Sequence, residues 1–90
     1  MVILLALLTA CDATCRQACS KLVDCQAVDN SGTHKDECQE ACLAQNGLYE
    51  DDWEDETLTQ AFNDQRNCIR DSTCDDIAAG ECYDETLWSW

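Results

Sequence analysis

Apolar and small residues recur at helical spacing directly after the first eleven residues. In the stretch from Asp12 to Ala27, "DATCRQACSKLVDCQA", they fall three or four positions apart, and polar residues fill the rest of each turn. The members of this apolar face are Cys15, Ala18, Cys19, Leu22 and Cys25. Such a period puts them on one side of an amphipathic helix. The pattern therefore predicts a first helix over 12–27.

A second helical segment follows a turn. The letters "DNSG" at 29–32 are typical of a turn, and Thr33 stands three residues before Asp36, which resembles a capping box with a shorter acid. One face then carries Cys38, Ala41, Cys42 and Gln45. Gly47 is available as a left-handed stop, so we expect this helix to end near Asn46.

Two shorter helices are expected in the second half. The acidic run "LYEDDWEDE" at 48–56 predicts a loop, and "TLTQ" at 57–60 forms a capping box for a third helix. Its apolar face is Leu58, Ala61, Phe62, Gln65, Cys68 and Ile69. A fourth helix is expected with Ser72 as its cap, with Cys74, Ile77 and Ala78 facing inward and Gly80 as its end. No strand pattern occurs, so the expected fold class is all-α.

The words "CRQAC" at 15–19 and "CQEAC" at 38–42 repeat one spacing of cysteines. Residues four apart share a helix face, and their parallel Cβ vectors do not suit a bridge within one helix. Two antiparallel helices would instead join Cys15 to Cys42 and Cys19 to Cys38. A bridge needs Cα atoms about 5.5–6 Å apart, closer than the usual distance between helix axes of about 8–10 Å. Small residues must therefore lie at the contact, and Ala18 and Ala41 are expected there.

The four cysteines outside the two repeated words can pair with one another in three ways. Cys25 must pair with Cys68, Cys74 or Cys82, and the other two then pair with each other, so one bridge ties the hairpin to the C-terminal half. We favour Cys25–Cys74 with Cys68–Cys82, because Cys74 starts the short helix and Cys82 follows its glycine stop. The expected architecture is a small disulfide-stapled bundle of an antiparallel helical hairpin plus two further short helices.

Residues 1–10, "MVILLALLTA", have the composition of a signal peptide, although they lack the usual basic start. The domain would then comprise residues 11–90. The letters "LTAC", Leu8 to Cys11, resemble the lipobox of bacterial lipoproteins, which implies that Cys11 is lipidated and becomes the new N-terminus. Nine cysteines leave one over in any complete disulfide set, and a lipid on Cys11 removes the odd one.

The cysteine pattern has two resemblances. The twin C-x3-C arrangement from Cys15 to Cys42 is similar to α-hairpinins and related helical hairpins, which act as inhibitors, toxins or import substrates. The lipobox with the later "CIRDSTCDDIAAGEC" resembles small cysteine-rich lipoproteins of Gram-negative bacteria. This likeness implies a non-enzymatic structural or binding module, attached through Cys11 to a membrane of the bacterial cell envelope, either periplasmic or at the cell surface. The alternative is a secreted, unlipidated helical-hairpin inhibitor or toxin-like effector.

The net charge of −14 excludes one class of partner. Nineteen acids stand against five basic residues, so the field repels phosphate, and nucleic acid is not an expected partner. Leu, Ile and Val are few after Cys11, and a small core must rely on its bridges, which contribute about 2–4 kcal/mol each.

The residues give little support for catalysis or for metal binding, and neither enzymatic activity nor a cofactor is expected. Zinc or an iron–sulfur cluster would need thiolates, but cysteines of exported proteins pair with one another. His34 is the single histidine, so a hydrolytic triad would depend on that one residue. The acids around Trp53 suit calcium by type but lack the spacing of a calcium loop.

The three tryptophans, Trp53, Trp88 and Trp90, are the candidate partner contacts. Exposed aromatic side chains often mark interfaces, and "TLWSW" at 86–90 alternates polar and aromatic residues as an added strand would. The alternative is that Trp53 or Trp88 covers the small core while Trp90 frays.

Overall fold

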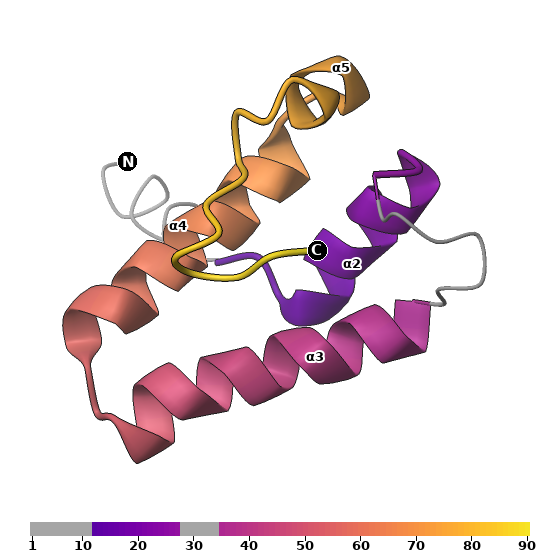
Figure 1. Ribbon diagram of the computed structural model, residues 1–90. Helices are drawn as coiled ribbons and strands as arrows, with labels where there is room; N and C mark the ends of the chain where they lie inside the picture. The colour runs from indigo at the N-terminus through magenta and orange to yellow at the C-terminus, as the bar shows by residue number, and fades with distance from the viewer. Residues whose placement is uncertain (1–11, 28–34) are drawn as a thin grey trace, which may run out of the picture.

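The computed structural model describes residues 12–27 and 35–90, and these residues form an all-α fold (Figure 1). The elements are α2 (Cys15–Asp24), α3 (Lys35–Gly47), the π-helical turn η1 (Leu48–Asp52), α4 (Glu56–Asp71) and α5 (Cys74–Ala78). Helix α2 packs against both α3 and α4 and so occupies the centre of the bundle. The described residues contain no strand, and Asp84 and Trp88 form an isolated bridge. The all-α, disulfide-stapled fold class expected from the sequence is confirmed.

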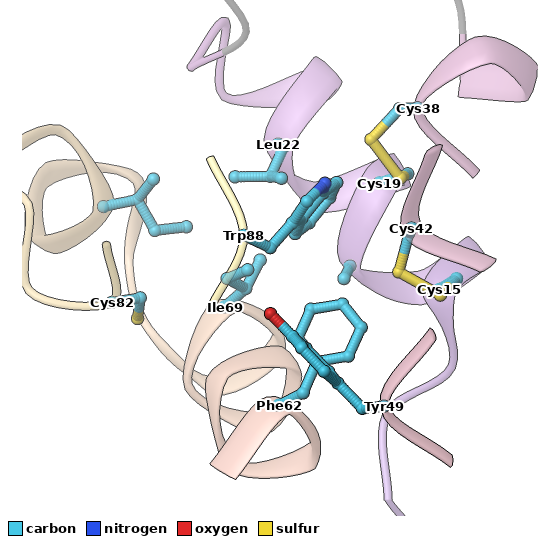
Figure 2. Close-up of a cluster of buried hydrophobic side chains, with 12 residues drawn as sticks. Cys15, Cys19, Leu22, Cys38, Cys42, Tyr49, Phe62, Ile69, Cys82 and Trp88 are labelled. Atoms are coloured by element: carbon cyan, nitrogen blue, oxygen red, sulfur yellow. A yellow bond between two sulfur atoms is a disulfide. The ribbon is translucent and has the colours of Figure 1, made fainter. Parts of the chain in front are cut away.

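Two disulfides join α2 to α3 as the rungs of a hairpin. Cys15 is bonded to Cys42 and Cys19 to Cys38, each with Cα atoms 5.7 Å apart. Figure 2 shows the two rungs side by side between the helices. Because the first cysteine of one word meets the last cysteine of the other, the two helices run antiparallel. The pairs match those expected from the repeated spacing.

The other two disulfides fasten the C-terminal part of the chain. Cys25, just after α2, is bonded to Cys74 at the start of α5, and Cys68 of α4 is bonded to Cys82. These are the favoured pairs among the three options that the sequence left open. The first of them is the one bridge between the hairpin and the C-terminal half.

Ala18 and Ala41 differ in a way that corrects the expected contact. Ala18 is fully buried, whereas Ala41 is exposed. The helices approach along the edge of α3 that carries Cys38 and Cys42, so that Ala41 lies on its solvent side. One small residue, on α2, is enough for both rungs to close.

The start of α2 and the end of α3 also differ from the expectation. Helix α2 begins at Cys15, where Thr14 and Gln17 form a reciprocal capping box that the sequence did not single out. Gly47 has a φ of −62°, so it is an ordinary helical residue and α3 continues into η1. The expected left-handed stop at Gly47 is therefore wrong, as is an entirely irregular loop over 48–56. Packing of the buried Tyr49 against Phe62 extends the helical path beyond the glycine.

The caps of the last two helices lie next to the expected ones. Asp55 caps α4, since its Oδ1 accepts from the Leu58 N–H at 3.0 Å, so the expected capping box at Thr57 is wrong. Thr73 caps α5 in place of Ser72, whose own N–H closes the last turn of α4. Gly80 has a φ of +84°, which confirms it as the left-handed residue after α5.

The inward face of α5 is smaller than expected. Ile77 is buried, but Cys74 and Ala78 are exposed, because a helix of this length presents little more than one side chain to the core. The main core instead lies between α2, α3 and α4 and includes Leu22, Ile69 and Phe62. Phe62 makes edge-to-face contacts with Tyr49 and Trp88, at centroid distances of 5.7 and 5.8 Å (Figure 2).

Several sequence-based expectations lie outside the described residues. They are the signal peptide over 1–10, the lipid attachment at Cys11, the turn at 29–32, the cap Thr33 and the single histidine His34.

Candidate functional site

The structure separates the three tryptophans. Trp88 is only 8% exposed and belongs to the core. Trp90 is partly buried, with its ring 5.6 Å from that of Trp88 and the ring of Tyr83 packed on it at 5.0 Å. Trp53 is 56% exposed. Trp53 is thus the tryptophan that remains a candidate for contact with a partner. Trp88 covers the core as the alternative interpretation holds, but the expected fraying of Trp90 is wrong, because its ring packs against Trp88 and Tyr83.

The C-terminal "TLWSW" does not form an added strand. Trp88 forms its isolated bridge with Asp84, a residue of the same turn, and its N–H also donates to the Asp84 carbonyl. Gln65 Nε2 donates to the Trp88 and Cys82 carbonyls, both at 3.3 Å. These bonds, together with the burial of Trp88, fold the C-terminal segment back on α4, as Figure 1 shows.

Trp53 is held in place from its buried side. It ends η1, its N–H donates to the Leu48 carbonyl at 2.9 Å, and its ring centroid lies 5.6 Å from that of the buried Tyr49. Glu54, the next residue, has a φ of +48° and turns the chain toward α4. The tryptophan ring is therefore oriented by the core while more than half of its surface faces solvent.

An open acidic cleft of about 530 Å³ lies between η1 and the start of α4. Its lining residues are Glu50, Glu54, Asp55, Glu56, Thr59 and Gln60. The carboxylates repel anions and attract cationic groups. Trp53 does not line the cleft but directly precedes Glu54, which does, and an exposed tryptophan ring suits contact with a basic side chain because cations bind the face of an aromatic ring.

The described part of the chain contains no set of metal ligands and no free thiol. The eight cysteines from Cys15 to Cys82 are all bonded in pairs, so none of them is a free thiolate. Within residues 12–27 and 35–90, no group of three or more His, Cys, Asp or Glu side chains is arranged to hold a metal ion. The same residues contain no helix long and apolar enough to cross a membrane.

The sequence did not point to Arg66, which is 6% exposed and lies beside the apolar face of α4. Its guanidinium carbon lies 4.6 Å from the centre of the Phe62 ring. Its Nε donates to the Ala13 carbonyl at 2.9 Å, and its terminal nitrogens bond Asn46 and Asn63. Burial lowers the pKa of the guanidinium, while the charges of Asp12 and Glu50 oppose that shift.

Arg66 and Asn67 together hold the segment that precedes α2. The Ala13 N–H donates to Asn67 Oδ1 at 2.6 Å, and Asn67 Nδ2 donates to the Asp12 carboxylate at 3.0 Å. Ala13 is 1% exposed. The backbone partner of Arg66, the Ala13 carbonyl, lies 53 residues away in the chain, so no local sequence pattern could report this burial.

No family model matches this chain, and no curated protein or solved structure resembles it at a meaningful level.

Proposed function

We propose that this protein is a non-enzymatic lipoprotein of the bacterial cell envelope, attached to a membrane through lipidated Cys11 and serving as a structural or binding module. The observation that carries the proposal is the pairing of the cysteines. Four bridges use eight of the nine, and the ninth is Cys11, the residue that ends "LTAC". An exported protein seldom keeps an odd thiol, and a thioether-linked lipid is one way to remove it.

The disulfides also support export. Bridges of this kind form and persist in oxidising compartments such as the bacterial periplasm and the cell surface. Several acyl chains on one N-terminus hold a protein firmly, whereas a single chain holds it only marginally.

Mass spectrometry of the mature N-terminus tests the lipid attachment. We expect a first residue Cys11 that carries diacylglycerol and an acyl group, incorporation of labelled palmitate, and processing that globomycin blocks. Cys11→Ser is the matched control and should lose both the label and the membrane fraction while keeping four bridges. An unmodified N-terminus at another residue would refute the proposal.

The binding role is assigned to the exposed Trp53 and to the acidic cleft that begins with the next residue, Glu54. The carboxylates that line the cleft favour a basic protein partner over nucleic acid or an anionic surface. In a pull-down from native envelopes, Trp53→Ala should lose a partner that Leu43→Ala retains, since Leu43 is similarly exposed at 54% but lies on α3. Equal recovery with both variants would remove Trp53 from the interface.

The doubly stapled α2–α3 hairpin supports one alternative, a secreted inhibitor or toxin-like effector without lipid. A mature protein recovered from the medium, cleaved near residue 11 and free of lipid, would favour it.

A further inference from the structure

The four disulfides differ in how well the fold covers them. In the two rungs of the α2–α3 hairpin all four cysteines are buried. Cys82 is buried and Cys68 half-buried, and the Ser72 hydroxyl contacts both of their sulfurs, at 3.4 and 3.6 Å respectively. In the remaining bridge, Cys25 is half-buried and Cys74 is exposed. Cys74 is thus the one exposed residue among the eight bonded cysteines, all of which the structure describes.

The exposed bridge holds a helix that has few other contacts with the fold. Helix α5 has five residues, too few to be stable alone, and Ile77 is its buried residue. It makes few contacts with the other helices and follows α4 at the end opposite to η1, where the bridge joins it to the end of α2 (Figure 1). The position of α5 therefore depends on the Cys25–Cys74 bond and on one buried side chain.

Access to sulfur governs the rate of thiol–disulfide exchange, because an attacking thiolate must reach one of the two sulfurs. A buried bridge becomes accessible only when the structure around it opens. Cys74 is exposed, so its bridge needs the least opening. The reverse reaction favours the same order. Packed helices keep the thiols of a reduced rung opposed at high effective concentration, whereas the thiols of Cys25 and Cys74 separate once α5 undocks.

We propose that the Cys25–Cys74 disulfide is a site of thiol–disulfide exchange with a dithiol reductant, and that its reduction releases α5 while the other three bridges stay closed. One thiolate of the dithiol attacks the Cys74 sulfur, the S–S bond breaks, and Cys25 leaves as a thiolate that takes up a proton. The second thiol of the reductant then displaces Cys74 from the mixed disulfide. The protein gains two thiols, the dithiol becomes a disulfide, and an oxidised dithiol reverses the exchange.

The first test measures which bridge reacts first in the unaltered protein, with dithiothreitol as the dithiol. Free thiols are blocked, dithiothreitol is added, and the new thiols are trapped with iodoacetamide at successive times and located by peptide mass mapping. We expect Cys25 and Cys74 to be labelled together, at least about tenfold faster than the other six bonded cysteines. Earlier labelling of another pair, or simultaneous labelling of all eight, would overturn the proposal.

The second test measures whether reduction releases α5. At the dithiothreitol concentration that opens this one bridge, deuterium exchange should accelerate at the amides of Ile77 and Ala79, whose N–H groups are bonded to the Thr73 and Asp75 carbonyls. Exchange within α2 and α3 should stay the same, since both rungs remain closed. Unchanged exchange in α5 would mean that noncovalent contacts alone hold this helix, and would overturn the release.

Cys25→Ser combined with Cys74→Ser is the matched control, because it lacks the bridge. In this double variant the α5 amides should exchange fast without reductant, and the same dithiothreitol concentration should have no further effect. A further acceleration on adding dithiothreitol would assign the release to another bridge and overturn the proposal. Neither measurement involves the lipid at Cys11, so failure of the exchange site leaves the proposed function standing, and a protein without lipid leaves the exchange site standing.

Discussion

The Tyr49 hydroxyl is a buried polar group that joins two distant parts of the chain. It donates to the Leu87 carbonyl and accepts from Gln45 Nε2, which itself donates to the same carbonyl at 3.1 Å. The ring also packs against Phe62 and Trp53. One side chain therefore couples the C-terminal segment, the core and the exposed tryptophan.

Tyr49→Phe should lower the free energy of unfolding by about 1–2 kcal/mol, because it removes two hydrogen bonds from a buried site while keeping the ring. Urea unfolding followed by circular dichroism measures the change. Tyr83→Phe is the control, since Tyr83 is 43% exposed, and should change stability by less than about 0.5 kcal/mol. Equal effects would mean that the Tyr49 hydroxyl contributes nothing specific.

Two glycines give opposite expectations for the same substitution. Gly47 is helical, and a Cβ there would meet only Asp51 Oδ2 at 3.9 Å, an ordinary contact. Gly47→Ala should therefore raise stability by about 0.5–1 kcal/mol. Gly80 has a φ of +84°, so Gly80→Ala should lower stability by about 1 kcal/mol even though its Cβ would enter open space. Thermal unfolding of both variants tests the pair, and a destabilising Gly47→Ala would contradict the continuous α3–η1 path.

At the scale of elements, the sequence predicted the structure correctly where its pattern was compatible with one arrangement of the helices. The cysteine spacing required the antiparallel hairpin, and the apolar period placed Phe62, Gln65 and Ile69 on the inner face of α4, where they are buried. The residues at which the helices begin and end were harder to predict. Asp55 and Thr57 are two residues apart, Ser72 and Thr73 are adjacent, and each pair offers similar capping chemistry, so tertiary contacts choose between them.

The contact between α2 and α3 can be tested by enlarging one alanine at a time. Ala18 is fully buried beside both rungs, so Ala18→Leu should overpack the contact and cost about 1–3 kcal/mol. Ala41→Leu adds the same side chain on the exposed side of α3 and should cost little. Oxidative refolding yield and urea midpoints measure both. Equal losses would place Ala41 in the contact after all and contradict the geometry of the hairpin.

At the scale of the molecule, the candidate site was only partly predictable. The sequence did not decide which tryptophan is exposed, and the fold buries Trp88 and leaves Trp53 exposed. The acidic run is evident in the sequence, but its cleft lies between η1 and the start of α4, and the sequence predicted a loop where η1 forms. Arg66 and the docked Ala13 depend on contacts between segments far apart in the chain, and no local pattern reports such contacts.

The bridge from Cys25 to Cys74 is the covalent tie between the hairpin and the C-terminal half. It closes a separation of 49 residues, against 14 for Cys68–Cys82. The loop-closure model gives about 4 kcal/mol for the longer and about 3 kcal/mol for the shorter. Apart from the bridge, α5 is held by the single buried side chain of Ile77. Loss of the tie should therefore loosen α5 before the hairpin.

The double variant Cys25→Ser with Cys74→Ser avoids a free thiol and should keep the other three bridges. We expect a stability loss of about 4 kcal/mol and new protease cleavage between Cys68 and Cys82, while the stapled α2–α3 hairpin stays intact. The paired replacement of Cys68 and Cys82 is the comparison and should cost less, because that loop is shorter. If the Cys25 and Cys74 variant keeps the unfolding midpoint and proteolysis pattern of the unaltered protein, noncovalent contacts between α2 and α4 alone unite the two halves.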